Sequence, residues 1–291
     1  MKKAIKLLSL VLAVVMCVFC FAACGSSENN GDDNSTASTT ASSNDEPQKT
    51  IVVGYTEYEP MNYTNDSGKL VGFDTELAEK VFGNLGYKVI FKLIQWENKY
   101  TDLNAGTINC IWNGFTCNSA DEDGVLRADK VDFSYNYMEN RQAIVVKKDS
   151  GISSAADLNG KIGVAEAGSA GESYAKGFEG AVIKPAVKQT DGLMEVNAGT
   201  ADFASVDVQL ARSYCGKGDY ADLMFVEALS SDVEFYAIGF KKGSDLTAKV
   251  NAELEKLGAD GTITALAEKY GVANTAIIDF ADQKAPAVDE K

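Results

Sequence analysis

The sequence predicts an α/β protein with parallel sheets and a chain divided into two lobes. Short β-branched runs alternate with segments of helical periodicity from about residue 50 to residue 270, which is the pattern of strands joined by crossover helices. The alternation begins again after the polar break at residues 147–151. At 291 residues the chain is also long enough for two medium-sized domains.

The first 23 residues have the composition of a secretory signal peptide. A basic start and a short apolar core at residues 7–21 lead to Ala22-Ala23 and then Cys24. Small residues directly before a cysteine resemble the bacterial lipobox, although Phe21 stands where that motif usually has leucine. We therefore expect a lipoprotein signal peptide at 1–23 and a lipid on Cys24, with cleavage without lipidation as the alternative.

The segment that follows is polar and of low complexity. Residues 24–49 are mainly Ser, Thr, Asn, Asp, Glu and Gly, too few of them apolar to form a core, so a flexible tether is expected there. No later stretch approaches the roughly 20 apolar residues needed to span a membrane. At the other end, residues 281–291 are expected to form a loose tail.

Composition excludes several classes of function. The net charge of −15 disfavours nucleic acid and anionic lipid as partners of the folded part. The chain has no histidine, which removes the commonest general base and the commonest transition-metal ligand. Three cysteines follow the tether, Cys110, Cys117 and Cys215, and their spacing is not that of a metal site. A Cys110–Cys117 disulfide and three buried thiols are both open, and we predict no metal site and no cofactor.

The first α/β series covers residues 50–112. Strands are expected at 51–54, 89–94 and 108–112, because these runs are short, apolar and β-branched. Helices are expected at 75–85, with Asp74 as the N-cap, and at 99–104.

The strand at 108–112 ends in the turn Asn113-Gly114-Phe115-Thr116, and a single arginine, Arg127, follows. Glycine lets the backbone approach a ligand closely. Main-chain N–H groups and Thr116 could face one carboxylate oxygen, and the guanidinium fork of Arg127 the other. The alternative is a surface loop with a solvated arginine.

A second series begins after the polar break. We expect strands at 141–146 and 162–165, and within 199–207 a turn followed by a short strand that ends on an acid. Helices are expected around Tyr174 and at 192–198, then a β-rich run at 233–240 and helices at 246–257 and 263–269. Two crossings, near 144–148 and 232–236, would join the lobes, so that lobe 1 comprises 50–145 and 235–280 and lobe 2 comprises 146–234. Two connecting strands predict a hinge.

Three features fall where strands end. These are Gly114–Thr116, the turn at Gly168–Ala170, and Asp207. Open α/β sheets bind ligands at the carboxyl ends of their strands. The glycine-serine turn also places free amides at a helix N-terminus, where anions bind.

Taken together, the motifs resemble extracellular solute-binding proteins of family 3, the polar amino-acid receptors of ABC importers. The resemblance covers about residues 50–275, and it rests on the ordered series Tyr-Glu-Pro-Met, Gly-Phe-Asp, the tryptophan at 96, Leu-x-x-Gly, Asn-Gly-Phe-Thr, Arg-x5-Phe-Ser-x-x-Tyr, Leu-x-Gly-Lys-Ile-Gly-Val, Ala-Asp-Gly-Thr-Ile and Glu-Lys-Tyr-Gly. It implies a two-lobed type II periplasmic-binding-protein fold whose lobes are joined by two hinge strands.

The resemblance also implies a ligand site. Arg127 would bind the ligand's α-carboxylate, Asp207 its α-ammonium, and aromatic side chains its side chain. The full set of ligand-binding residues implied is Tyr58, Trp96, Asn113, Gly114, Phe115, Thr116, Arg127, Gly168, Ser169, Ala170 and Asp207. The chain departs from the family in one interval, because Thr116 to Arg127 is about six residues longer than usual.

Each of these residues has a purely structural alternative. Tyr58 and Trp96 could be core aromatics, and Asp207 and Ser169 could be helix caps. Cys117-Asn118-Ser119 of the longer loop could add polar contacts to the ligand.

The function implied is that of a monomeric lipoprotein on the extracytoplasmic face of the cell membrane. It would capture a free amino acid by hinged closure and deliver it to an ABC permease. Basic-ligand members place an acid where this chain has Tyr55, which favours a polar or neutral amino acid, cystine among them. The rival functions are an enzyme of the dehydratase type on the same fold and the sensor domain of a signalling receptor.

Overall fold

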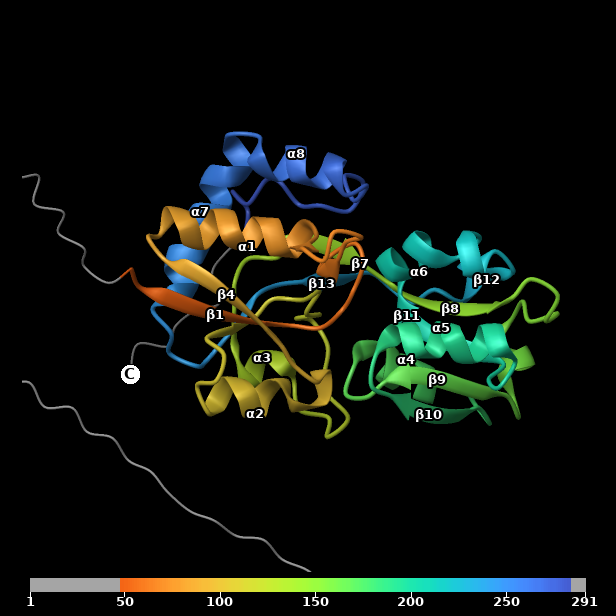
Figure 1. The fold of residues 1–291 in the computed structure, drawn as a ribbon. Coiled ribbons are helices and arrows are strands. Elements are labelled where there is room, and N and C mark those ends of the chain that lie inside the picture. The colour runs from red at the N-terminus through yellow and green to blue at the C-terminus, as the bar shows by residue number, and fades with distance from the viewer. Residues whose placement is uncertain (1–47, 284–291) are drawn as a thin grey trace, which may run out of the picture. The chain divides into compact units, whose positions relative to one another are not determined.

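The computed structural model describes residues 48–283, which form two sheets flanked by helices (Figure 1). The expected signal peptide at 1–23, the lipidation site Cys24 and the tether up to residue 47 lie outside the described residues. Across residues 48–283, every helix is too short or too polar to cross a membrane.

The first sheet contains five strands, in the spatial order β4 (Lys88–Leu93), β1 (Thr50–Tyr55), β5 (Cys110–Ile111), β14 (Gly239–Phe240) and β6 (Asp132–Phe133). β1 pairs in parallel with β4 and β5, whereas β14 is antiparallel to β5 and β6. Ile51 and Val53 of β1 are buried on one face, as the two-residue period of a strand requires.

Helices cover both faces of this sheet. In Figure 1, α1 (Phe73–Asn84), α7 (Leu246–Ala259) and α8 (Thr262–Lys269) lie on one side, and α2 (Lys99–Asn104) and α3 (Arg127–Lys130) on the other. The expectation that Asp74 caps α1 is wrong. The helix begins two residues earlier, with Gly72 at the N-cap, so Asp74 lies inside the first turn and is fully buried.

The second sheet has the order β10 (Val182–Ala186), β9 (Ile162–Glu166), β11 (Phe203–Asp207), β8 (Gln142–Lys147) and β12 (Leu223–Phe225). β9 is parallel to β10 and β11, but β8 is antiparallel to β11 and β12. Both sheets are therefore mixed, and the expectation of parallel sheets is wrong for the strands near each crossing.

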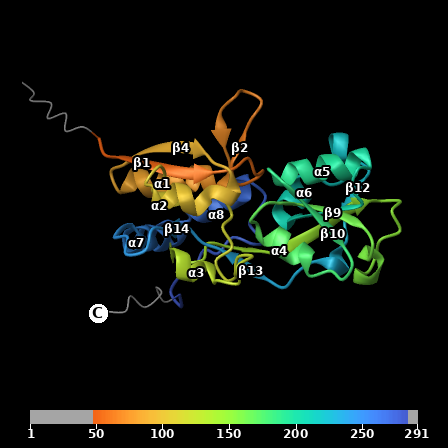
Figure 2. The same cartoon turned by 90° about the horizontal axis from the view of Figure 1, so that it is seen from below.

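The helices of the second lobe pack on both faces of its sheet. They are α4 (Ala170–Lys176), α5 (Gln189–Ala198) and α6 (Val208–Tyr214). Figure 2 shows α5 and α4 on opposite sides of β9. β8 is buried on both faces of the sheet. Its residues Ala143 and Val145 pack in the hydrophobic cluster beneath α5, and Ile144 and Val146 pack in the cluster beneath α4.

A two-stranded ribbon connects the lobes. β7 (Met138–Asn140) and β13 (Glu234–Tyr236) pair antiparallel, with Asn140 opposite Glu234. The first crossing therefore lies at 138–141 and not near 144–148, because β8 is a strand of the second sheet. The expected run at 233–240 is two strands, β13 in the ribbon and β14 in the first sheet.

The remaining short elements are the β2 (Tyr63–Thr64) and β3 (Leu70–Val71) hairpin and the 3-10 turns η1 (Trp96–Asn98), η2 (Ala155–Leu158), η3 (Gly218–Tyr220) and η4 (Glu227–Leu229). The expected loose tail is held as far as Gln283, which exchanges hydrogen bonds with the backbone of Asn136. Cys110, Cys117 and Cys215 are free thiols, so the disulfide alternative is not realised.

Candidate functional site

A small cavity lies between the lobes and is lined by polar residues of both. The lining residues are Trp96, Asn113, Gly114, Thr116, Arg127, Gln142, Glu166, Ser169, Ala170, Gln189, Ser205 and Asp207. The space that a water-sized molecule can occupy among them is about 10 Å³, roughly that of one water. The lobes are thus closed on each other, and a larger ligand enters only when they separate.

The turn after β5 is held rigidly by the loop that follows β1. The side-chain amide of Asn113 donates to Thr56 O (2.9 Å) and to Asn62 Oδ1 (2.7 Å), and its oxygen accepts from Thr56 Oγ1 (2.6 Å). Gly114 has a φ of +58° and lies so close to Tyr58 that a Cβ would meet Tyr58 Cε1 at 2.6 Å. Only glycine fits this position, and the amide of Gly114 donates to Asp74 Oδ2 (2.9 Å).

The Trp96 ring lines the cavity and is backed by two phenylalanine rings of lobe 1. The Trp96 ring meets Phe115 edge-to-face at a centroid distance of 5.2 Å, and Phe115 meets Phe133 at 4.9 Å. Lys99 Nζ lies 5.0 Å from the centroid of the Trp96 ring. Burial lowers the pKa of Lys99 to about 7, and the neighbouring Arg127 charge acts in the same direction.

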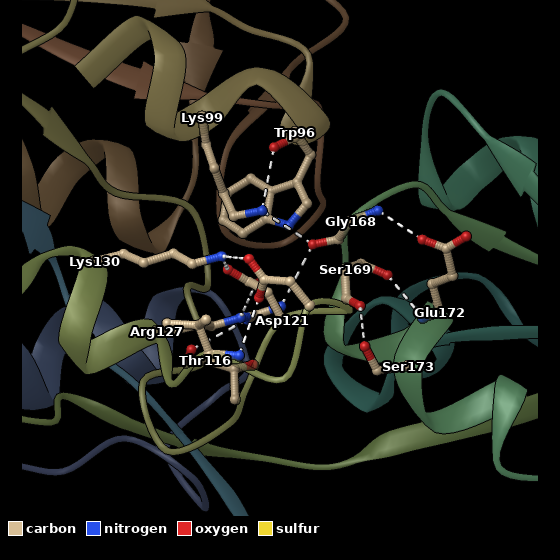
Figure 3. Close-up of polar contacts among 12 residues, drawn as sticks. Trp96, Lys99, Thr116, Asp121, Arg127, Lys130, Gly168, Ser169, Glu172 and Ser173 are labelled. Carbon is tan, nitrogen blue, oxygen red and sulfur yellow. Dashed lines mark hydrogen bonds and ion pairs between the residues drawn. The ribbon is translucent and has the colours of Figure 1, made fainter. Parts of the chain in front are cut away.

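Arg127 is 1% exposed and its guanidinium contacts both lobes (Figure 3). Its Nε donates to Asp121 Oδ1 (2.9 Å), Nη1 to Thr116 O (3.1 Å) and Nη2 to Gly168 O of the second lobe (3.4 Å). Asp121 belongs to the lengthened loop and also accepts from Lys130 Nζ at 2.9 Å. The longer interval before Arg127 therefore supplies a carboxylate that fixes the orientation of the guanidinium.

The turn at Gly168 is the part of lobe 2 that contacts Arg127 and Lys99 of lobe 1. Gly168 O accepts from Lys99 Nζ (3.0 Å) as well as from Arg127, so two cations of lobe 1 bind one carbonyl of lobe 2. Ser169 is the N-cap of α4, and its Oγ accepts from the amide of Glu172 (3.0 Å). The Gly168 amide is bound by Glu172 Oε2 (2.7 Å), so this turn offers fewer free amides than expected.

Asp207 lies at the end of β11 and is 7% exposed. Its Oδ1 accepts from Asn140 Nδ2 and Gln142 Nε2, both at 2.7 Å, and its Oδ2 from Gln189 Nε2 at 2.6 Å. It occupies the N-cap position of α6 without capping the helix through its side chain. Burial raises the pKa of Asp207, and the amide donors oppose that rise.

Two further carboxylates surround Asp207. Glu234 of the hinge ribbon accepts from Thr116 Oγ1 (2.9 Å), Asn140 Nδ2 (2.6 Å) and Gln142 Nε2 (2.7 Å). Burial raises the pKa of Glu234 to about 7, with the charge of Asp207 adding to the effect. Burial likewise raises the pKa of Glu166, at the end of β9, to about 8. Three carboxyl groups, those of Asp207, Glu166 and Glu234, thus lie at or beside the cavity, and burial raises the pKa of each.

Eight of the eleven ligand-binding residues expected from the sequence line the cavity. Tyr58 does not line the cavity. It is 1% exposed, and its hydroxyl lies 2.8 Å from that of Tyr236, so in this closed conformation it is a core aromatic residue. Phe115 lies behind Trp96 and Arg127. Gly168 contributes its carbonyl to the contact between the lobes.

Four lining residues were missed, namely Gln142, Glu166, Gln189 and Ser205. Glu166 ends a recognised strand and could have been found by the same rule as Asp207. Gln142 begins an antiparallel strand, whose amino end lies at the edge where parallel strands have their carboxyl ends. Gln189 follows β10, which the sequence reasoning did not recognise.

The chain is similar to known amino-acid-binding proteins. Bacterial extracellular solute-binding proteins, family 3, match over residues 51–273. The arginine-binding extracellular protein ArtP of Bacillus subtilis (strain 168) is 28% identical over 266 residues, covering 90% of this chain and 96% of ArtP. The L-cystine-binding protein TcyA of the same organism is 28% identical over 275 residues, covering 93% and 97%.

Among solved structures, an ancestral arginine-binding protein bound to arginine is 33% identical, with a TM-score of 0.69, covering 77% of this chain and 98% of that protein. The two-lobed α/β fold expected from the sequence is confirmed. With a match that spans most of the chain and a cavity at the strand ends of both lobes, this chain belongs to the bacterial extracellular solute-binding proteins of family 3.

Proposed function

We propose that this protein captures a free amino acid between its lobes and delivers it to an ABC importer. The observation that carries the proposal is the pairing of opposite charges across the cavity. Arg127 of lobe 1 and Asp207 of lobe 2 both line it, and both are at least nine-tenths buried. A zwitterion loses its water when the lobes close, so each of its charges needs a partner of the opposite sign.

Arg127 has the capacity to bind an α-carboxylate. A guanidinium has five N–H donors, and three of those of Arg127 are used by Asp121, Thr116 and Gly168. The two that remain suit the two oxygens of a carboxylate. The hydroxyl of Thr116 and the N-terminal turn of α4 at Ser169 and Ala170 line the same space.

Asp207 has the capacity to bind an α-ammonium. A carboxylate has about four acceptor positions, and three are used by Asn140, Gln142 and Gln189. These amides hold the carboxylate in place without neutralising its charge. An ammonium group is the complementary donor for the position that remains.

Closure couples binding to transport. The ligand's two charges would bind different lobes, so the ligand has a higher affinity for the closed state than for the open one. The ribbon of β7 and β13 is the hinge about which the lobes would move. A permease that distinguishes closed from open protein would then receive loaded protein, which acts as a monomer.

Membrane attachment is a separate part of the proposal. Family membership places the protein outside the cytoplasm, and the sequence around Cys24 favours a lipid anchor there. The mass of the mature N-terminus, measured by mass spectrometry, should show an acylated Cys24. A Cys24→Ala protein that remained membrane-bound, or an unmodified Cys24, would contradict the anchor.

Thermal melting against the twenty amino acids and cystine tests the binding function. A cognate ligand at a thousandfold excess over its Kd should stabilise the folded protein by about 4 kcal/mol. The shift should vanish in Arg127→Ala and Asp207→Ala, and Glu179→Gln, an exposed carboxylate on lobe 2, serves as the control. Recovery of the ligand with unchanged mass separates a receptor from an enzyme. No shift with any of these compounds would overturn the proposal.

A further inference from the structure

Glu166 is the one carboxylate lining the cavity that has no hydrogen bond from the described residues. It lies at the carboxyl end of β9 and is 3% exposed. Burial and the charges of Asp207, Lys99 and Asp191 act on it, but no donor contacts its oxygens. Asp207, on the neighbouring strand, has three side-chain amide donors by contrast.

No nearby cation satisfies Glu166. The ammonium of Lys99 donates to the carbonyls of Gly168 and Trp96, at 3.0 and 3.4 Å. Arg127 is bound by Asp121, Thr116 and Gly168. Burial of a carboxyl group without a donor destabilises the fold, so its presence here is not explained by packing or stability.

The hydroxyl of Ser205 is a second polar group of lobe 2 in the same condition. It lines the cavity, is buried, and has no partner in the described part of the chain. Glu166 and Ser205 belong to adjacent strands of one sheet. Lobe 2 therefore presents one unpartnered carboxyl group and one unpartnered hydroxyl to whatever occupies the cavity.

This inference rests on the proposed function, in which Arg127 and Asp207 bind the α-carboxylate and the α-ammonium. We propose that Glu166 binds a second cationic nitrogen on the ligand's side chain, so that the preferred cargo is a basic amino acid. The two carboxylates of the lining, Glu166 and Asp207, would then face the two cationic groups of the ligand, and Arg127 would face its carboxylate. Each charge of the ligand would have one partner of opposite sign.

The proposal favours a basic amino acid over cystine. Cystine carries a second carboxylate besides its second ammonium, and that carboxylate would need a further cation. Lys99 does not line the cavity, and its ammonium already donates to two carbonyls. The position of Tyr55, which favours a neutral ligand on the family pattern, concerns only lobe 1, whereas Glu166 comes from lobe 2.

Calorimetric titration of the wild type, Glu166→Gln and the control Glu179→Gln tests the inference. The ligands are arginine, lysine and cystine, with citrulline as the neutral analogue of arginine. The wild type should bind arginine or lysine at least about tenfold more tightly than citrulline. Glu166→Gln should lose about tenfold or more for the basic ligand and change less than about threefold for citrulline.

A second measurement guards against misfolding. Because glutamine keeps the shape of Glu166 and replaces a carboxyl group that has no donor, ligand-free Glu166→Gln should melt no lower than the wild type. Tightest binding of a neutral amino acid or of cystine, or an equal loss for arginine and citrulline in Glu166→Gln, would overturn the role of Glu166 and leave the receptor function intact. Absence of binding to every amino acid would overturn both.

Discussion

Asp74 shows how one residue outside the cavity supports the binding turn. It is fully buried beneath Gly114, and its Oδ2 accepts from the Gly114 amide and from Tyr137 Oη, each at 2.9 Å. Its Oδ1 has no partner among residues 48–283. Burial raises the pKa of Asp74 from its ordinary value of 3.8 to about 7, while the two donors oppose the rise.

The raised pKa predicts a pH dependence of stability. Between about pH 4 and pH 7 the folded protein holds a proton on Asp74 that the unfolded chain has released, so the free energy of unfolding falls as pH rises through this window. Asp74→Asn should remove up to about 1.4 kcal/mol per pH unit of that slope. Urea unfolding of both proteins at pH 5, 6 and 7 measures it, and parallel curves would contradict the assignment.

At the scale of elements, the lengthened loop between Thr116 and Arg127 acts on the guanidinium. Asp121 Oδ1 accepts from Arg127 Nε, and Asp121 Oδ2 from Lys130 Nζ. Asp123 of the same loop pairs only with Lys130 among these cations and is 57% exposed. The loop thus positions Arg127 through a single carboxylate.

This arrangement predicts different effects for two substitutions of Asp121. Asp121→Asn keeps an oxygen for Arg127 Nε, so ligand affinity should stay within about threefold. Asp121→Ala leaves Nε without an acceptor, so the guanidinium is held only through Nη1 and Nη2 and binding should weaken about tenfold. Calorimetric Kd values measure this, with Asp123→Ala as the matched control. An equal loss in both Asp121 variants would show that its charge matters and its positioning does not.

From the sequence, the positions of the strands could be predicted better than their parallel or antiparallel directions. Alternating apolar runs revealed β1, β4, β9 and β11, because a buried strand leaves its period in the sequence. The direction of β8 depends on its long-range pairing with β11, which no local pattern records. β10 was missed because only part of it is shielded from water and it contains Pro185.

The same limits applied to the site. The Gly114 turn and Asp207 could be predicted because each stands at the end of a strand that the sequence reveals, whereas Arg127 was predicted as the single arginine before Phe133-Ser134 and from the resemblance to the family. Tyr58 was placed in the ligand site although its ring packs against Tyr236, a residue 178 positions further along the chain. Contacts of that sequence separation are set by the closure of the whole fold.

At the scale of the molecule, a few polar contacts join the lobes in the closed state. Lys176 of α4 pairs with Glu122 of the lengthened loop, and Lys99 donates to Gly168 O. Both side chains of the Lys176–Glu122 pair are almost half exposed, so the pair contributes at most about 1 kcal/mol. This exposed pair by itself therefore favours closure without ligand only weakly.

Charge reversal at the Lys176–Glu122 pair should weaken ligand affinity slightly, and a second reversal at the partner residue should restore it. Glu122→Lys places like charges across the cleft, disfavours the closed state and should weaken ligand binding by up to about fivefold. Adding Lys176→Glu should restore most of the affinity, since the pair is re-formed with reversed signs. A double-mutant cycle of Kd values tests this, and strictly additive effects would show that the pair does not couple.

The two tryptophans of the chain lie in contrasting places. Trp112 is fully buried in the core of lobe 1 against Phe82, while Trp96 is 5% exposed at the cavity, against the lysine of α2. We expect separation of the lobes to hydrate the Trp96 indole while Trp112 stays buried in the core of lobe 1. Tryptophan emission should then shift to shorter wavelength when the cleft closes over cargo, and Trp96→Phe should abolish that shift while the emission of Trp112 remains.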